Sequence, residues 1–171
     1  NLTQDHNEKN KTWKKYIKAK FKLLKNQSRG NWAFVKKDDL LINKELKLNK
    51  FPCKLIKVDK KKINKFLKDI KNEYFSTDTN KENLSFVFEI SKKLKLKNKL
   101  MIKTFQKFNG LKYRQQVIFK NKYLKIINDS KSTSFSSSIG VLKANHKIYW
   151  LLGGIYKKGD KFKLSKKYFN N

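Results

Sequence analysis

The sequence has 171 residues, of which 38% are hydrophobic and 13% aromatic, which is enough for a folded core and excludes a disordered chain. Its formal net charge of +31 is typical of proteins that bind nucleic acid or anionic membranes. Cys53 is the only cysteine, and His6 and His146 are the only histidines. These counts exclude a disulfide framework, a zinc knuckle and a histidine-rich metal site.

The basic residues are almost all lysines. Only Arg29 and Arg114 are arginines among 44 basic residues, although the recognition of phosphates and bases relies on the guanidinium fork. Lys and Asn are abundant and Gly and Pro are scarce, as AT-rich codons would produce. We therefore interpret the lysines as solvated surface and expect no nucleic-acid partner. The alternative from another class is a lysine-rich RNA-binding or ribosomal protein, whose RNA binding would depend steeply on salt.

The first predicted element is a helix over residues 11–25. Trp13, Ile17, Phe21 and Leu24 fall on one face of it at helical spacing. Lys20 stands three residues after Ile17 and four before Leu24, so the spacing places it within this apolar stripe. A cationic lysine facing inward is costly unless its head reaches solvent or changes its charge state.

Strands and helices then follow as far as a glycine. The apolar runs predict strands over 32–35 and 54–58. The periodicity predicts helices over 63–70, 81–94 and 99–108. Gly110 interrupts the pattern, and we place a domain boundary there, with residues 1–110 in one domain and 111–171 in the next.

After Gly110 the pattern predicts a second α/β segment. Strands over 116–119 and 123–127 are joined by a turn at 120–122, and Thr133 or Ser134 can cap a helix that runs to about residue 144. Residues 148–152 form a continuous apolar run that predicts a buried strand, ended by two glycines. Strand, helix and strand would make a right-handed parallel unit with a ligand at the carboxyl ends of its strands.

No apolar run reaches membrane-spanning length, and no signal peptide is visible. We expect a cytoplasmic protein without membrane insertion. The chain begins at Asn1 without a methionine, and we expect both of its ends to be cuts.

Six segments in order resemble motifs of one family, the Mur ligases, and within it the branch that adds D-glutamate. They span nearly the whole chain: NLTQDH (1–6), YIKAKFKLL (16–24), TNKENL (79–84), GLKYR (110–114), INDSKST (127–133) and WLLGGIYKKGDKF (150–162). The resemblance implies an α/β fold, with the distal half of a P-loop-type ATPase domain followed by the first part of a Rossmann-like C-terminal domain.

The resemblance also implies a reaction. It is ATP-dependent formation of an amide bond between UDP-N-acetylmuramoyl-L-alanine and D-glutamate, through an acyl phosphate, with ATP and Mg²⁺ as cofactors, in the synthesis of peptidoglycan. The complete protein would be a monomer. The chain has no Gly-Lys-Ser/Thr phosphate loop, so we expect it to be inactive by itself. A nearer alternative is a related ligase of the folylpolyglutamate type, against which the string Asn128-Asp129-Ser130-Lys131 argues.

The same resemblance assigns the catalytic and metal-binding roles. Lys20 aligns with the family's modified lysine, whose carbamate offers the hard oxygen ligands that Mg²⁺ prefers. His6 would contribute to a second magnesium site and approach the incoming amine. Lys131 would neutralise the transferring phosphate. An ordinary lysine that reaches past its neighbours is the alternative for Lys20, and a solvated lysine is the alternative for Lys131.

The remaining residues would bind substrates. Asn80, Asn83, Arg114 and Asp129 would bind ATP, and Thr133 and Lys157 would hold the carboxylates of D-glutamate. Simple structural roles are open for several of them: Asn80 could cap a helix, Asp129 could cap a loop, and Thr133 could cap the helix that follows it.

Overall fold

The structure is a computed structural model that describes residues 12–155, 160, 162, 164, 165 and 169. The predicted site residues His6 and Lys157 lie outside the described residues. The described part mixes helices and strands, so it has the α/β character expected from the sequence.

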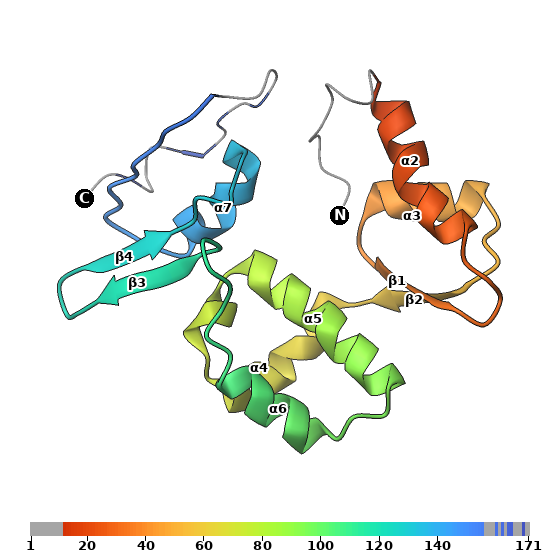
Figure 1. The fold of residues 1–171 in the computed structure, drawn as a ribbon, viewed down its shortest axis with the longest axis horizontal. Coiled ribbons are helices and arrows are strands. Elements are labelled where there is room, and N and C mark those ends of the chain that lie inside the picture. The colour runs from red at the N-terminus through yellow and green to blue at the C-terminus, as the bar shows by residue number, and fades with distance from the viewer. Residues whose placement is uncertain (1–11, 156–159, 161, 163, 166–168, 170–171) are drawn as a thin grey trace.

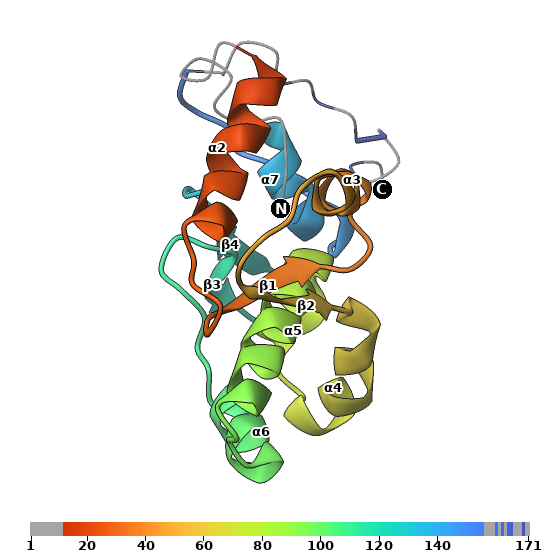
Figure 2. The same ribbon diagram turned by 90° about the vertical axis from the view of Figure 1, so that its right-hand side faces the viewer.

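The first region is a parallel strand pair with helices on either side (Figures 1 and 2). Helix α2 (Trp13–Lys25) begins after Thr12, whose hydroxyl accepts a hydrogen bond from the backbone N–H of Lys15. Strand β1 (Trp32–Lys36) pairs in parallel with β2 (Lys54–Val58). Helix α3 (Leu40–Leu48) forms the connection between them.

Helix α3 is absent from our sequence prediction, although its start signal is visible there. Asp39 is its N-cap, and the Asp39 carboxylate accepts a hydrogen bond from the backbone N–H of Ile42 at 3.0 Å. Ile42 is buried and joins Tyr16, Ile17, Phe21 and Val35 in one apolar cluster. The helix therefore completes a β–α–β unit in this region.

Four further helical segments follow β2 in the chain. They are η1 (Lys60–Ile63) with α4 (Asn64–Ile70), η2 (Glu73–Ser76), α5 (Asp78–Lys93) and α6 (Asn98–Gln106). Of these, α5 lies against the other side of the strand pair (Figure 2). The buried face of α5 carries Leu84 and Phe88, each 2% exposed. Their cluster is completed by Ile63, Ile70, Phe75, Met101 and Phe105.

An ion pair fastens α5 to the end of β1. Glu82 of α5 accepts from the Lys36 ammonium at 2.7 Å, and both side chains are largely shielded from solvent. The hydrogen bond to Glu82 raises the pKa of Lys36, so the lysine stays charged.

The second region consists of a hairpin and one helix. Strands β3 (Gln116–Lys120) and β4 (Lys125–Asn128) are antiparallel, with an irregular register between Val117 and Phe119. Helix α7 (Phe135–Lys143) follows, and its residues Val141 and Leu142 form a small cluster with Leu164.

The predicted strand over 148–152 is wrong. Ile148 and Trp150 pack against the cluster of α7, but the segment carries no strand, and Tyr149 and Leu151 are 92% and 95% exposed. A strand requires a hydrogen-bonded neighbour, and within the described residues β4 pairs only with β3. The apolar run therefore marks a segment that packs on α7 through Ile148 and Trp150. The predicted parallel strand–helix–strand unit does not form, and β4 pairs with β3 in the antiparallel hairpin.

No helix in the described part of the chain is both long enough and apolar enough to cross a membrane.

Candidate functional site

The candidate site lies where the N-terminal turn of α5 meets the loop that leads into β3. Thr77 is the N-cap of α5, and its hydroxyl accepts from the backbone N–H of Asn80 at 3.3 Å. Asn80 is therefore not the cap. It is 5% exposed, and its Nδ2 donates to the Tyr74 carbonyl at 2.7 Å and to Oε1 of Gln115 at 3.0 Å. Asn83, one turn later, is exposed to solvent.

The loop over 110–115 adopts left-handed backbone conformations at three positions. Gly110 has a φ of 80°, and a Cβ there would lie 2.7 Å from the ring of Tyr74, so glycine is required. Tyr113 and Gln115 have φ values of 64° and 49°, which side chains rarely adopt. Such strain persists only where surrounding contacts impose it, and it often marks functional loops.

Arg114 stands within this loop with its side chain exposed, and its backbone N–H donates to the Leu111 carbonyl at 3.1 Å. Burial raises the pKa of the nearby Tyr74 phenol, while the positive charge of Arg114 acts in the opposite direction. Arg114 is thus a solvent-facing cation beside a half-buried tyrosine, at a point where an anionic ligand could reach it.

Asp129 holds the loop over 110–115 against the end of β4. Its Oδ1 accepts from the backbone N–H of Gln115 at 3.0 Å, and its Oδ2 accepts from the hydroxyl of Ser132 at 2.7 Å. The structure therefore gives Asp129 the loop-capping contacts that the sequence left open. Lys131 follows with an exposed side chain, while its backbone N–H donates to the Tyr113 carbonyl at 3.0 Å.

Helix α7 begins at a cluster of hydroxyl groups. Ser134, rather than Thr133, is the N-cap, and it forms a reciprocal capping box with Ser137. The backbone N–H of Phe135 donates to Oδ2 of Asp160 at 2.7 Å, so a carboxylate already lies at this helix terminus. Thr133 is exposed beside it and is not needed as the cap.

Lys20 does not face inward as the helical spacing predicts. Tyr16, Ile17 and Phe21 are buried, whereas Lys20 is exposed, with its ammonium 5.5 Å from the centroid of the Tyr16 ring. Lys20 lies at the edge of the apolar stripe and lines the mouth of a cavity of about 150 Å³, where its long side chain reaches solvent. The cavity is otherwise lined by Phe21, Leu24, Phe34, Val35, Lys36, Ile42 and Phe86.

This surrounding does not form a complete magnesium site. The cavity beside Lys20 has no carboxylate in its lining, and the described residues contain no group of three or more His, Cys, Asp or Glu side chains placed to hold a metal ion. Figure 1 also shows α2, which carries Lys20, well separated from the hairpin and α7. The structure thus brings Asn80, Asp129 and the Arg114 loop together, and Lys20 lies apart from them.

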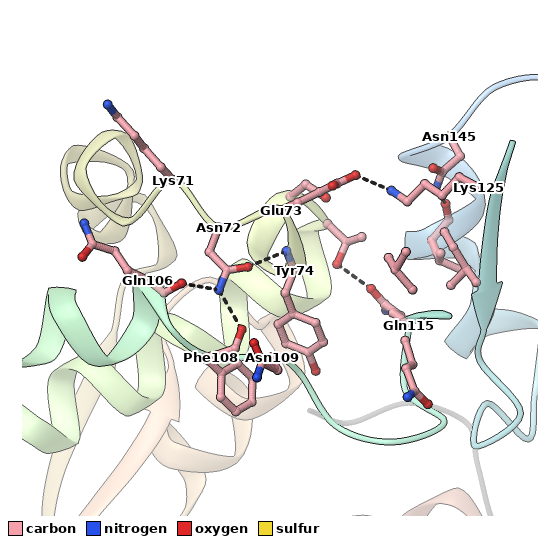
Figure 3. A pocket seen from close by; sticks show the side chains of 16 residues that line it. Lys71, Asn72, Glu73, Tyr74, Gln106, Phe108, Asn109, Gln115, Lys125 and Asn145 are labelled. Carbon is pink, nitrogen blue, oxygen red and sulfur yellow. Dashed lines mark hydrogen bonds and ion pairs between the residues drawn. The ribbon is translucent and has the colours of Figure 1, made fainter. Parts of the chain in front are cut away.

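A second cavity, of about 320 Å³, opens between η2, the end of α6, the hairpin and α7 (Figure 3). Glu73 bridges it, because its carboxylate accepts from both Lys120 and Lys125 of the hairpin. These two lysines hold the pKa of Glu73 below its ordinary range. Asn72 lines the side of the cavity that faces away from the hairpin, and its Nδ2 donates to the Phe105 and Phe108 carbonyls at 2.8 Å (Figure 3).

Our sequence analysis did not identify Glu73, Tyr74 or Gln115 as site residues. Gln115 directly follows Arg114, and Glu73 is one of only 13 acidic residues, so each carried a weak signal. The side-chain partners of Glu73 and Gln115 lie between 35 and 52 positions away in the chain, which periodicity does not reveal.

Residues 1–111 match the Mur ligase middle domain. The chain belongs to the Mur ligase family. The match ends at the loop described above, so the strained segment over 110–115 begins where the matched domain stops.

Among the relatives of this Mur ligase chain are proteins named UDP-N-acetylmuramoylalanine–D-glutamate ligase. The one from Rickettsia prowazekii is 28% identical over 99% of this chain and 42% of its own length. The one from Rickettsia felis is 28% identical over 93% of this chain and 39% of its own length. The one from Buchnera aphidicola is 38% identical over 62% of this chain and 24% of its own length. The chain thus spans about two fifths of the length of the two Rickettsia relatives.

Proposed function

We propose that this chain is part of a ligase that uses ATP to join D-glutamate to UDP-N-acetylmuramoyl-L-alanine in the synthesis of peptidoglycan in the cytoplasm. The observation that carries the proposal is the match of proteins with this printed name across 93% to 99% of the chain. The match extends beyond residue 111, and so covers the hairpin and α7 as well as the Mur ligase middle domain.

In the proposed reaction, a carboxylate oxygen of UDP-N-acetylmuramoyl-L-alanine attacks the γ-phosphorus of ATP, and ADP leaves. The resulting acyl phosphate is then attacked at its carbonyl carbon by the amine of D-glutamate. An amide forms, phosphate departs with the electron pair of the broken C–O bond, and the amine loses a proton. The protein contributes mainly by positioning reactants and neutralising charge.

Two exposed cations of the second region suit that task. Arg114 and Lys131 are both solvent-facing, and the Lys131 backbone is bound to the carbonyl of Tyr113, the residue before Arg114. A guanidinium can bind two phosphate oxygens at once, and an ammonium on its flexible side chain can stay close to the phosphate as it is transferred. We assign Arg114 to the nucleotide and Lys131 to the transferring phosphate.

The nucleotide site would be completed by Asn80, Asn83 and Asp129, and D-glutamate would be held by Thr133 and Lys157. Asn80 and Asp129 are already committed to contacts within the protein. They would therefore shape the nucleotide site rather than bind ATP through free side chains. Asn83 is exposed, so its side chain is accessible to a ligand. Thr133 is exposed beside the hydroxyl cluster of α7.

For Mg²⁺ the described residues do not form a complete site, and we derive no step through the metal. The assignment of Lys20, as a carbamate, and of His6 to metal binding remains a proposal that rests on the resemblance of their segments to family motifs.

The test is the release of phosphate from ATP by the complete polypeptide that contains this chain, with UDP-N-acetylmuramoyl-L-alanine present. Release should require D-glutamate and should not occur with L-glutamate. The 171-residue chain by itself should release none. Release that depends on another amino acid, or none in the complete polypeptide, would contradict the proposal.

A matched pair of variants tests the arginine assignment. Arg114→Lys should raise the KM for ATP by about tenfold, because the bidentate contact is lost. Arg29→Lys, at the other exposed arginine of the chain, should leave the KM for ATP unchanged. Equal effects at both positions would remove Arg114 from the nucleotide site.

A further inference from the structure

Besides the ion pairs of Glu73, one glutamine side chain, that of Gln115, connects the two regions of the chain. Oε1 of Gln115 accepts from the Thr77 hydroxyl at 2.9 Å and from Nδ2 of Asn80 at 3.0 Å. Thr77 and Asn80 are 6% and 5% exposed; Thr77 is the N-cap of α5, and Asn80 lies in its first turn. The contact therefore lies in a shielded place, where a lost hydrogen bond is costly.

The backbone of the same residue connects in the other direction. The N–H of Gln115 donates to Asp129 at 3.0 Å, and the other oxygen of Asp129 accepts from Ser132. Gln115 is thus bound through its side chain to Thr77 and Asn80, and through its backbone to Asp129. Asn80 and Asp129 are two of the four residues that the proposed function assigns to the ATP site, one on each side of Gly110.

The conformation of Gln115 supports a specific role. Its φ of 49° is unfavourable for any residue with a Cβ, and asparagine or glycine would adopt it more readily. Asparagine is one methylene shorter, and glycine has no side chain, so neither would place an amide oxygen between Thr77 and Asn80. The strain is therefore balanced by the two hydrogen bonds that only a longer side chain can accept.

We propose that Gln115 is a positioning residue that fixes Asn80 relative to Asp129 and thereby sets the width of the ATP site between the two regions. The proposal rests on the proposed function, because that function supplies the ATP-binding roles of Asn80 and Asp129. Gln115 itself acts through these neighbours and makes no contact with the reacting atoms.

Two substitutions separate the acceptor from the shape of the side chain. Gln115→Met keeps a similar length but removes the acceptor, so Thr77 and Asn80 lose their common partner. Gln115→Glu keeps the acceptor oxygen and offers it as a carboxylate, so both donors retain a partner. A purely steric role predicts that the two variants behave alike, whereas the positioning role predicts opposite behaviour.

The first measurement is the distance between spin labels at Lys99→Cys on α6 and Lys122→Cys in the hairpin turn, both exposed positions, with Cys53→Ala to leave no other thiol. The parent and the Gln115→Glu protein should give one narrow distance distribution. The Gln115→Met protein should lose it and give a broad one, while its circular dichroism stays that of the parent.

Gln106→Met is the matched control. Gln106 and Gln115 line the same cavity of about 320 Å³, but Nε2 of Gln106 donates to the Asp69 carbonyl, within the first region. Loss of that hydrogen bond should therefore leave the distance distribution narrow. A narrow distribution in Gln115→Met, or an equally broad one in Gln115→Glu, would overturn the proposal.

The second measurement is ATP kinetics in the complete ligase. Gln115→Met should raise the KM for ATP more than it lowers kcat, and Gln115→Glu should restore the KM. An unchanged KM in Gln115→Met would overturn the role of Gln115. Failure of the proposed function would be seen separately, as absence of D-glutamate-dependent phosphate release in the parent.

Discussion

The regions on the two sides of Gly110 are stabilised in different ways. The first has two apolar clusters, and the larger one contains seven buried residues, Phe88 among them. The second has one described cluster of three buried residues, and Leu151 and Ile155 are 95% and 99% exposed. The position of the second region therefore depends more on polar contacts to the first region, made by Glu73 and Gln115, than on a large apolar core of its own.

This difference bears on function. A region placed by a few hydrogen bonds and ion pairs can change position at a smaller free-energy cost than one packed through a large apolar surface. The candidate site lies on that polar boundary, with Asn80 on one side and Asp129 on the other. Variants that weaken one region and leave the other intact can test the comparison.

The largest expected effect is in the core of the first region. Phe88→Ala should lower the free energy of unfolding by about 3–5 kcal/mol, because a side chain that is 2% exposed leaves a cavity between α5 and its neighbours. Leu142→Ala, in the small cluster of α7, should cost about 2 kcal/mol, at the low end of the usual range. Urea unfolding measures both, and a larger loss for Leu142→Ala would contradict the comparison.

The ion pair between β1 and α5 should come next. Glu82→Gln leaves the Lys36 ammonium without its carboxylate in a largely shielded position, and we expect a loss of about 2 kcal/mol in urea unfolding. Lys37→Met breaks the exposed pair between Lys37 and Asp59 and serves as the control, with little change expected. Similar losses in both variants would show that shielding does not decide the effect.

The contact between α5 and α7 offers a compensation test. A Cβ on Gly140 would lie 2.8 Å from Oγ1 of Thr79, so Gly140→Ala should cost about 1 kcal/mol despite the better helix propensity of alanine. Thr79→Ala removes the clashing oxygen, and the next atom of Thr79 is 3.7 Å away. The double variant should therefore be more stable than Gly140→Ala in thermal unfolding. If it is less stable, the two helices do not meet at this point.

The smallest effect should be the pH dependence of the Glu73 contacts. Its pKa is lowered in the folded protein by hydrogen bonds from Lys120 and Lys125, so the contribution to stability is present above the unfolded pKa of about 4.3. It is lost as the pH falls through the lower folded value. Glu73 is 48% exposed, so the contribution should stay below about 1 kcal/mol.

Unfolding of the parent and of Glu73→Gln, followed from neutral pH to below pH 4, measures this term. The two proteins should differ at neutral pH and converge in acid. A difference that grows in acid would have the wrong sign for this mechanism.

Apart from α3, the α-helices and the hairpin could be predicted from the sequence because their signals are local. Apolar residues three and four positions apart define the buried faces of α2 and α5, and a short polar turn joins β3 to β4. The start of α7 was predicted to within one residue, and the structure selects Ser134 over Thr133. Family motifs, which are also local strings, indicate the Mur ligase family without reference to the fold.

Only the tertiary structure decided which of these residues are buried and which segments pair with one another. Helical spacing assigned Lys20 to the apolar stripe, but the packing of α2 leaves it exposed. The run over 148–152 is apolar enough for a strand, yet strand formation depends on a neighbouring backbone that composition does not specify. The bond between Asn80 and Gln115 joins residues 35 positions apart, so only the folded chain brings them together and makes the boundary between the two regions a site.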